Sequence, residues 1–546
     1  MATADSGDGR EEIDIAIVGA GAAGTYCAWR LQTPQNGRTA VLFELSERIG
    51  GRLLSRDIPG IPGVVGELGG MRFLSLQRLI VSLTQHLGLA TSNFPMGGAE
   101  NIATLRGVRL RNAVFEYPQV VPYRLLPGEQ GSSPGSLLVK AIKTVIPNAD
   151  SLTPQEWEQV KQTTTWNGDY LYNWGLWNVL LSNNAAAAGN PPVLSSEGYA
   201  LLYDGGGYES LVDNWNCAEA FEYLLIDFPK EAQYLRLSQG YQRLPEALAK
   251  EFAAAGGKIN MNHRLVTFAP KEVDGATMID LDVMDEATNA MRRYRASALI
   301  LAIPQRALEI LAQATPTLAT PAVRELLNAV MAMPAYKALA VYDRPWWNEE
   351  LGIKAGRSTT DLPIRQVYYM DSAKPPNTTS LMLATYADGR AQSFWDGLYK
   401  GPKFRKKFAI TPNKFFPPAG AAALKELDPY LAPDDFGRTL HALTADMHQL
   451  GPDRIPWPNA VYAKDWTEDP YGGGWHFWRH SIKVWQTLPR LRQPVDHLPL
   501  HICGESYANQ QGWVEGALTS AEHVVQKYFK LQTPSWLYPQ NYFLGP

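Results

Sequence analysis

Three glycines near the N-terminus have the spacing of a dinucleotide-binding turn. The segment Ile13–Gly24 reads IDIAIVGAGAAG, in which an apolar run is followed by Gly19, Gly21 and Gly24. Glycine is needed there because the chain bends tightly, lies against a pyrophosphate and then packs a helix closely on the strand. A helix beginning near Ala22 would point its free N–H groups, including that of Ala23, at the phosphates.

An acidic residue ends the next predicted strand. Glu44 closes the run TAVLFE, 20 residues after Gly24, where an acid accepts hydrogen bonds from a ribose diol. A strand, a glycine-rich turn, a helix, a second strand and an acid, in that order, predict a dinucleotide site. The alternative is a glycine-rich turn in an ordinary α/β protein.

Two further glycine- and arginine-bearing segments indicate which dinucleotide is bound. RIGGR occupies 48–52, and GELGGMRF occupies 66–73. A nicotinamide enzyme has no obvious use for these loops, whereas FAD lies extended and needs close backbone along both its phosphates and its ring system. The candidate cofactor residues in these loops are Gly51, Arg52, Gly70, Met71 and Arg72.

A C-terminal segment completes the set of motifs. Residues 499–520 read PLHICGESYANQQGWVEGALTS, and the whole succession resembles the flavin-containing amine oxidase superfamily. The resemblance implies that Glu505, after Gly504, bonds the ribityl–pyrophosphate region of FAD. It also implies that Trp513 and Val514 lie along the flavin. The backbone near Leu265 is implied to contact the adenine.

The resemblance also implies a fold of the mixed α/β (α+β) class. A Rossmann-like FAD-binding domain is expected to combine 11–75, 237–325 and 476–535. A substrate-binding domain with a mixed sheet is expected from 76–135 and 326–475, and a helical insert from 136–236. Locally, apolar spacing predicts a helix over 76–90 that ends at Gly88. Thr153 and Glu156 have the spacing of a helix capping box.

Composition sets limits on location and partners. The chain has 546 residues, a net charge of −4 and 45% apolar residues, which is typical of a large globular enzyme and argues against a nucleic-acid partner. Three cysteines far apart favour a reducing compartment and give no metal pattern. Without an apolar run of membrane-spanning length or a visible secretory signal, we expect a cytoplasmic protein. The alternative is a protein exported by another route. A homodimer is also expected, and the basic stretch Gly401–Ala422 predicts an insertion near 401–436.

An α-amino acid substrate would need a cation for its carboxylate. Arg72 is the candidate, because a planar guanidinium holds a carboxylate through two parallel N–H bonds. In L-amino acid oxidases of the snake-venom type, which this chain resembles, the corresponding motif reads GPMR and its arginine binds the substrate carboxylate. This chain has Gly70 in place of that proline. The alternative is an arginine that serves only the fold or the flavin.

A longer resemblance to the venom enzymes extends the site. RSTTDLPIRQVYY (357–369) and KALAVYDRPWW (337–347) resemble their segments. Lys337 is thereby implied to hold a water against flavin N5, and Tyr386 to be the second carboxylate ligand. Gly512 would supply a carbonyl for the amine, Trp513 an aromatic wall and Trp475 part of the side-chain pocket. The alternatives are a strand-edge lysine and aromatic residues that only pack in the core.

Side-chain preference depends on Asp388. It follows Tyr386 by two residues, so on a strand both side chains would point to the same face. A carboxylate near Trp475 would favour a cationic substrate side chain through ion pairing and cation–π contact. The alternative is a solvated turn aspartate, because Asp388-Gly389 is a common turn dipeptide.

Taken together, these features predict an FAD-dependent L-amino acid oxidase that leans toward arginine or lysine. Its reactants would be an amino acid and O₂, and its products a 2-oxo acid, ammonia and hydrogen peroxide. The segment around Trp475 carries no cysteine, so non-covalent FAD is expected. The alternatives are an amine or polyamine oxidase, an amino acid 2-monooxygenase, an NAD(P)-linked dehydrogenase and a catalytically idle flavoprotein.

Overall fold

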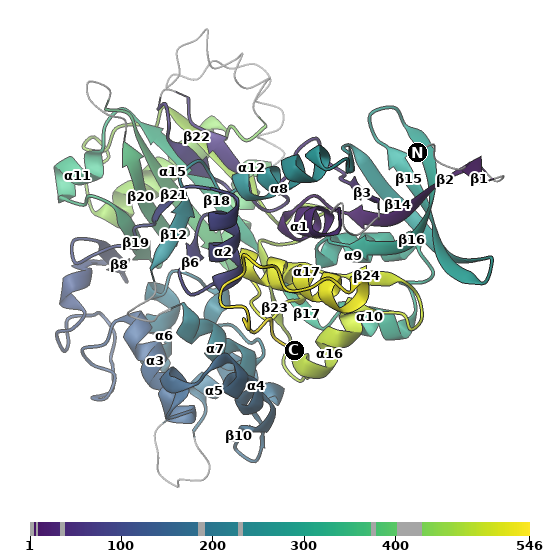
Figure 1. The fold of residues 1–546 in the computed structure, drawn as a ribbon. Coiled ribbons are helices and arrows are strands. Elements are labelled where there is room, and N and C mark those ends of the chain that lie inside the picture. The colour runs from purple at the N-terminus through teal and green to yellow at the C-terminus, as the bar shows by residue number, and fades with distance from the viewer. Residues whose placement is uncertain are drawn as a thin grey trace.

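Two large sheets and a group of helices make up the fold in the computed structural model (Figure 1). The structure describes residues 5–6, 9–32, 39–59, 61–183, 192–227, 233–372, 378–400 and 429–546. In the figure an eight-stranded sheet lies on the right, a seven-stranded sheet at the upper left, and the helices of 134–226 at the lower left. The mixed α/β class is therefore confirmed. Most of the insertion predicted near 401–436 lies outside the described residues.

The eight-stranded sheet combines strands from three distant parts of the chain. Its main path is β13-β3-β2-β16-β15-β14, while β1 pairs with β2 and β24 with β16. The bounds are β1 (Asp5–Ser6), β2 (Arg10–Val18), β3 (Ala40–Phe43), β13 (Lys258–Asn260), β14 (His263–Val273), β15 (Ala276–Asp285), β16 (Ala290–Leu301) and β24 (Leu500–Ile502). Strands β3, β2, β16 and β24 are parallel neighbours, and β14, β15 and β16 are antiparallel.

The apolar residues of the parallel strands alternate between two cores. On β2, Ile15 and Ile17 belong to one core, and Ala16 and Val18 belong to the other. The first core includes α1 (Ala22–Leu31), α8 (Arg243–Ala254) and α17 (Val514–Phe529). The second includes α9 (Gln305–Ala314), α10 (Pro321–Leu327) and α16 (Val484–Arg492). Because both faces are covered, these strands read as nearly continuous apolar runs.

The seven-stranded sheet is also buried on both faces. Its order is β22-β18-β21-β20-β19-β8-β9. The bounds are β8 (Ile102–Leu105), β9 (Val108–Arg111), β18 (Ala335–Tyr342), β19 (Gly356–Thr360), β20 (Gln366–Ser372), β21 (Ser380–Asp388) and β22 (Ala460–Asp465). On β18, Tyr336 and Ala338 pack in a core with α11 (Trp346–Leu351), α12 (Gly389–Lys400) and α15 (Asp434–His448). Leu339 and Val341 pack on the opposite face, toward the helices at the lower left of Figure 1.

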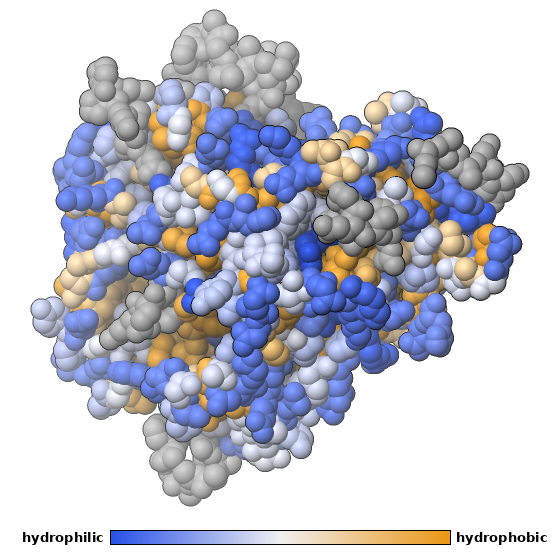
Figure 2. All heavy atoms as spheres, in the orientation of Figure 1, coloured by the Kyte–Doolittle hydropathy of each residue, from blue (hydrophilic) through white to orange (hydrophobic). Residues whose placement is uncertain are grey.

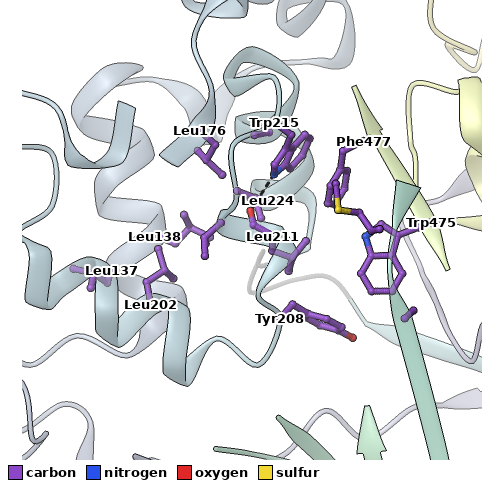
Figure 3. Packing of buried hydrophobic residues seen from close by; sticks show 14 of the residues in the cluster. Leu137, Leu138, Leu176, Leu202, Tyr208, Leu211, Trp215, Leu224, Trp475 and Phe477 are labelled. Atoms are coloured by element: carbon purple, nitrogen blue, oxygen red, sulfur yellow. Dashed lines mark hydrogen bonds between the residues drawn. The ribbon is translucent and has the colours of Figure 1, made fainter. Parts of the chain in front are cut away.

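Five helices form the lower part of the molecule. They are α3 (Pro134–Val145), α4 (Pro154–Thr163), α5 (Leu176–Leu181), α6 (Ser196–Gly205) and α7 (Cys217–Ile226). The predicted capping box is confirmed, because Thr153 and Glu156 exchange side-chain and backbone hydrogen bonds at the start of α4. Figure 3 shows leucines of these helices packed together, and Trp215 beside Phe477, whose rings stack with centroids 3.9 Å apart. This contact joins the helices to the rest of the chain.

Short elements connect the three parts. The strands are β4 (Ser55–Asp57), β5 (Val65–Glu67), β6 (Phe73–Leu74), β7 (Thr91–Asn93), β10 (Thr165–Trp166), β11 (Asp169–Tyr170), β12 (Tyr234–Leu237), β17 (Val330–Met333) and β23 (Trp475–Trp478). The 3₁₀ turns are η1 (Asn112–Val114), η2 (Ala149–Ser151), η3 (Leu171–Asn173), η4 (Ser210–Val212) and η5 (Glu505–Tyr507). Strand β6 pairs with β12, and β17 pairs with β23. The residue boundaries of the expected domains stay predictions.

The visible surface is mainly hydrophilic. Figure 2 shows blue and white residues over most of this face, with hydrophobic atoms most extensive in a recess at the lower left. Within the described residues, no helix combines the length and the apolar character that crossing a membrane requires.

Helix α2 (Arg78–His86), inside the predicted range 76–90, begins at a side chain from the other end of the sequence. The buried Glu515, in the first turn of α17, accepts hydrogen bonds from the N–H groups of Leu79 and Ile80 at 2.9 and 2.7 Å. It also accepts the hydroxyl of Tyr542 at 2.6 Å. No side chain of α2 itself caps that end, so Glu515 supplies acceptors that the helix otherwise lacks.

We predict that Glu515→Gln destabilises the protein. Glutamine has the size of glutamate but no charge, and its NH₂ group would face the N–H groups that the carboxylate now accepts. The free energy of unfolding should fall by about 2–4 kcal/mol. Thermal denaturation at a fixed flavin concentration would measure this. Glu116→Gln, at an exposed position, is the matched control. Equal melting temperatures for the two variants would contradict the capping role.

Candidate functional site

A cavity opens where four of the parallel strands of the eight-stranded sheet end, namely β2, β3, β16 and β24. It has a volume of about 360 Å³, and we call it the glycine-lined cavity. Its walls include the residues that directly follow β2, β3 and β16, and Gly504, the second residue after β24. Ligands of open parallel sheets bind outside the carboxyl ends of the strands, so the fold places a binding site where the sequence motifs predicted one.

Most of the predicted cofactor residues line this cavity. They are Gly19, Gly21, Ala22, Ala23, Glu44, Gly51, Arg52, Gly70, Leu265, Gly504, Glu505, Trp513 and Val514. Gly24, Met71 and Arg72 do not. Met71 is buried in the apolar core on the site-facing side of the seven-stranded sheet, so its expected contact with the cofactor is not supported.

Each glycine of the first turn has a separate steric reason. Gly19 has a φ of +100°, and a Cβ there would lie 2.6 Å from the carbonyl oxygen of Ala302. A Cβ on Gly24 would overlap the carbonyl oxygen of Gly19, so this residue sets the close packing of α1 on β2. At Gly21 the nearest atom to a Cβ is the Gly51 Cα at 3.8 Å. Protein packing therefore does not require glycine at 21, where the backbone lies open to the cavity.

The start of α1 offers unpaired donors to the cavity. No side chain caps the helix at Gly21, and Ala22 and Ala23 line the cavity. Free N–H groups at a helix N-terminus and the helix dipole both favour an anion. A pyrophosphate therefore fits this part of the cavity.

Glu44 follows β3 at the cavity wall, as predicted. Its carboxylate accepts the N–H of Ala20 at 2.7 Å and the N–H and hydroxyl of Ser46 at 2.9 and 2.8 Å. These bonds fix the carboxylate and leave it capacity for one further donor.

A break in strand pairing brings backbone groups to the cavity beside Leu265. Leu265 pairs with Val283 and Thr267 with Asp282, so Val266 is the extra residue of a bulge. A bulged residue leaves its backbone groups outside the ladder. Leu265 and Val266 both line the cavity, so backbone donors and acceptors are available at the position predicted for adenine.

Glu505 is engaged by protein partners rather than left open. It accepts the N–H of Gly512 at 2.7 Å, the N–H and ring nitrogen of His476 at 2.9 and 3.0 Å, and an ion pair from Arg52 at 2.6 Å. Burial opposes its charge, but Arg52 and His476 lower the pKa of Glu505 to about 2. The four acceptor directions of the carboxylate are occupied by protein donors, so the structure gives no support to the expected direct bond to the cofactor, which stays a prediction. Glu505 instead orients Arg52 and Gly512.

The loop before β6 is held by side chains of two other segments. Trp466 donates its indole N–H to the carbonyl of Leu68 at 2.8 Å, and Lys337 donates to the carbonyl of Gly69 at 2.6 Å. Gly70 donates to the carbonyl of Arg52 at 3.1 Å. These bonds fix the backbone that enters Arg72.

Lys337 lies on β18, as the sequence predicted, and is only 2% exposed. Its Nζ lies 4.4 Å from the centre of the Tyr386 ring. Burial and the nearby charge of Arg72 lower the pKa of Lys337 to about 7, although Glu67 acts in the opposite direction. Burial likewise raises the pKa of Glu67 to about 7. The pair can therefore gain or lose a proton near neutral pH.

Arg72 is a buried cation without a carboxylate partner. It donates to the hydroxyls of Tyr368 at 3.1 Å and Tyr208 at 3.5 Å, and its Nε has no acceptor. The rings of Phe94 and Tyr234 lie 5.6 and 5.2 Å from its guanidinium carbon. No carboxylate of the described residues lies within ion-pair distance, so the charge stays available to an anionic ligand.

Three rings meet edge to face beside Lys337. Tyr208, Tyr386 and Trp475 have centroids 5.2 to 6.2 Å apart and interplanar angles of 85–88°, and we call them the aromatic cluster. Figure 3 shows Tyr208 reaching from the loop after α6 toward Trp475. The indole N–H of Trp475 is buried and has no acceptor. The predicted Tyr386 and Trp475 are thus brought together.

The aromatic cluster adjoins the glycine-lined cavity at Gly512. A Cβ on Gly512 would lie 2.9 Å from the Tyr223 hydroxyl and 3.7 Å from the Cβ of Trp475. Gly512 and Trp513 line the cavity. The aromatic cluster and the cavity, predicted from separate motifs, therefore lie side by side.

Asp388 does not face this site in the way the sequence predicted. Its buried carboxylate accepts the N–H groups of Glu209 and Ser210, each at 2.9 Å, and the Ser210 hydroxyl. Asp388 is 0% exposed and does not line the glycine-lined cavity. Its carboxylate holds the loop after Tyr208, so the structure does not support its expected role with a cationic substrate side chain. Strand alternation gave its face correctly, but it could not reveal these neighbouring donors.

Two tyrosines of the site were not predicted. Tyr368 lies within the segment 357–369. It is two residues from Gln366, so on a strand the two side chains would point to the same face of the sheet, and this spacing could have indicated it. Tyr208 lies in the irregular segment DGGGY, which has no periodicity. His476, the partner of Glu505, also carried no pattern in the sequence.

Comparison with known families identifies the class of protein. A model described as flavin containing amine oxidoreductase matches residues 22–406 and 422–527. The chain belongs to this family. It is therefore an oxidoreductase, and family membership implies a flavin cofactor.

Similar proteins extend along nearly the whole chain. Achacin of Lissachatina fulica is 26% identical over 540 residues, covering 95% of this chain and 93% of achacin. Aplysianin-A of Aplysia kurodai is 26% identical over 545 residues, covering 95% of this chain and 91% of its own. An L-amino-acid oxidase of Mus musculus is 28% identical over 518 residues, covering 93% of this chain and 69% of that protein.

Solved structures of putrescine oxidase share the fold. A double mutant of that enzyme has a TM-score of 0.64 at 17% identity, covering 95% of this chain and 99% of the other. The wild type bound to putrescine has a TM-score of 0.59 at the same identity and coverage.

We predict that Gly21→Ala removes flavin binding while the chain still folds. The methyl group fits beside Gly51 but occupies the space where a phosphate would meet α1, so flavin affinity should fall at least about tenfold. Flavin content and the melting temperature of the apoprotein would measure the two effects separately.

Two glycine variants serve as comparisons. Gly397→Ala, in α12 with no atom within 4 Å of the new Cβ, should change neither property. Gly24→Ala should impair folding itself, because its Cβ overlaps the Gly19 carbonyl. Flavin binding by Gly21→Ala at wild-type strength would place the phosphates elsewhere.

Proposed function

We propose that the flavin is FAD and that it binds without a covalent link. The donors at the start of α1, the fixed carboxylate of Glu44 and the bulge at Val266 would suit a phosphate, a ribose and an adenine, respectively. Of the three cysteines, Cys27 and Cys503 contact each other and Cys217 is buried among helices. None of these thiols lines the cavity.

The proposed activity is oxidation of L-α-amino acids. The buried Arg72 guanidinium, which has no carboxylate partner among the described residues, carries this proposal. A simple amine has no group for that charge, whereas an α-carboxylate would pair with it through two N–H bonds. The name of the Mus musculus relative, an L-amino-acid oxidase, also supports the proposal.

The remaining groups orient the substrate. Tyr386 would donate its hydroxyl to the same carboxylate, and Trp475 and Tyr208 would enclose the carbon chain. The backbone of Gly512, fixed by Glu505, would face the amine. Bringing reacting groups together in a dry enclosure supplies much of the rate enhancement in such enzymes.

When bound, FAD would supply a two-electron acceptor for a hydride from the substrate Cα, with O₂ as the final acceptor and hydrogen peroxide as its product. Lys337 would act beside it by holding a water and exchanging a proton near neutral pH, as its pKa of about 7 allows. Hydrolysis of the substrate-derived imine then gives a 2-oxo acid and ammonia.

Other flavin chemistry remains as alternatives. An amine or polyamine oxidase would leave Arg72 without a ligand, although the structural neighbours are named putrescine oxidase. An amino acid 2-monooxygenase would use the same carboxylate contact, so product analysis separates it, because it yields an amide and CO₂. An idle flavoprotein would bind FAD without reduction by any amino acid. A basic side-chain preference is not proposed, because it rested on Asp388.

We predict that wild-type flavin is bleached by L-amino acids under anaerobic conditions and that Arg72→Ala loses this reactivity. Loss of a charged partner should reduce kcat/KM by about 1.5–3 kcal/mol of transition-state stabilisation, roughly 10- to 150-fold. A panel of L- and D-amino acids, followed by absorbance near 450 nm, would measure it, with 2-oxo acid and peroxide as products.

The control for Arg72→Ala is its flavin content, which should remain near that of the wild type because Arg72 does not line the cavity. Near-normal kcat/KM in Arg72→Ala would overturn the carboxylate assignment. If no amino acid bleaches the wild-type flavin while a diamine does, the amine oxidase alternative is correct.

We predict that Lys337→Met slows flavin reoxidation or imine hydrolysis more than flavin reduction. The variant keeps the length of the side chain but removes the group that anchors the water. In the wild type the affected step should depend on pH with an apparent pKa near 7, as Lys337 loses its proton with rising pH. This dependence should disappear in the variant.

Stopped-flow absorbance separates the two half-reactions for this test. Glu67→Gln is the companion variant, because Glu67 opposes the lowering of the lysine pKa. Removing its charge should shift the pH dependence to lower pH. Unchanged half-reactions in Lys337→Met would show that the lysine only fixes the Gly69 carbonyl.

A further inference from the structure

A second arginine faces the substrate side of the site. Arg357 lies on β19 and pairs across strands with Tyr368 on β20, so the two side chains share a face of the sheet. Gln366 precedes Tyr368 by two residues and points to that face as well. The face is the one from which Tyr368 contacts Arg72.

Hydrogen bonds connect the two arginines through two neutral side chains. Arg72 donates to the Tyr368 hydroxyl at 3.1 Å, and this hydroxyl donates to Oε1 of Gln366 at 3.2 Å. Arg357 donates to the same Oε1 at 3.3 Å and to the carbonyl of Gly206 at 3.3 Å. The two guanidinium groups are therefore only three hydrogen bonds apart, beside the loop that leads to Tyr208.

Carboxylates near these arginines are committed to other partners. Glu209 accepts the N–H of Arg390 and lies 3.8 Å from Arg365, and Asp388 is occupied by the loop after Tyr208. Asp227 accepts the hydroxyl of Tyr234. Asp227 acts on the charge of Arg72 from a distance, but among the described residues neither Arg72 nor Arg357 forms an ion pair. This end of the site therefore holds two guanidinium groups without a direct carboxylate partner.

The buried groups without partners here are all donors. They are Nε of Arg72, Nε2 of Gln366 and the indole N–H of Trp475. Buried polar groups are normally hydrogen-bonded, so each of these implies an acceptor that the protein does not supply. A ligand with two carboxylates would supply acceptors both to the donors near Arg72 and to those near Gln366.

We propose that Arg357 and Gln366 form a subsite for an anionic substrate side chain, which makes acidic L-amino acids the preferred substrates. This inference rests on the proposed oxidase function. The α-carboxylate would pair with Arg72 and the side-chain carboxylate with Arg357. A neutral side chain would leave Arg357 unpaired, and a cationic one would be repelled by it.

Glutamate and glutamine provide the sharpest comparison, because they differ in charge but hardly in shape. In the wild-type holoenzyme, kcat/KM for L-glutamate should exceed that for L-glutamine about 10- to 100-fold, the scale of a charged hydrogen bond. Arg357→Gln should bring the ratio close to one, mainly through a higher KM for glutamate, and Arg357→Lys should restore part of it. Peroxide formation measures the rates.

Arg109→Gln is the matched control. Arg109 is a partly exposed arginine on β9 of the same sheet and donates to the backbone carbonyl of His448, in the core on the opposite face. Its substitution should leave the glutamate-to-glutamine ratio unchanged. A fall in this ratio equal to that of Arg357→Gln would show a general electrostatic effect and overturn the subsite.

Binding of non-reactive acids separates this inference from the oxidase assignment. By isothermal titration calorimetry, wild-type holoenzyme should bind glutarate at least about tenfold more tightly than butanoate, and Arg357→Gln should lose the difference. If leucine or glutamine is oxidised as well as glutamate, the subsite is wrong and the oxidase assignment stands. If no amino acid is oxidised, the proposed function fails, and equal glutarate and butanoate affinities would overturn the subsite as well.

Discussion

The site depends on keeping a guanidinium charged in the interior without an ion pair. Burying a charge is costly, and a carboxylate partner would offset that cost while neutralising the residue. Around Arg72 the structure uses ring faces and hydroxyl groups instead, from Phe94, Tyr234, Tyr208 and Tyr368. Rings and hydroxyls stabilise a cation only partly, so the charge remains free to act on a ligand.

Such a residue must also be held in place without strong contacts of its own. The backbone before it is fixed from the seven-stranded sheet by Lys337 and from the segment after that sheet by Trp466. The backbone after it enters β6, which pairs with β12. The position of Arg72 is thus set by main-chain bonds at both sides, while its side chain keeps its donors for a ligand.

The sequence predicted the parts of the site that depend on local spacing. The turn at Gly19 and the acid at Glu44 each follow from a short pattern, whereas the strand of Lys337 follows from the family resemblance. The structure places all three as expected. Contacts between distant segments could not be predicted in this way. Asp388 and Glu505 are the clearest cases, because the donors that occupy their carboxylates lie in the loop after Tyr208 and beside His476. The sequence therefore cannot show whether the carboxylate of an acidic residue is free for a ligand or is already hydrogen-bonded to other parts of the protein.

The first turn of α17 serves two regions at once. Val514 lines the glycine-lined cavity, and the next residue, Glu515, holds the N-terminus of α2, the helix that follows β6. One helix end therefore contacts both the glycine-lined cavity and the segment from Arg72 to α2. A ligand that stabilises the first turn of α17 when it fills the cavity would therefore also stabilise the packing of α2 against that turn. Such an effect is thermodynamic linkage between two binding steps. Occupation of the cavity and the placement of Arg72 would then be coupled through one helix end.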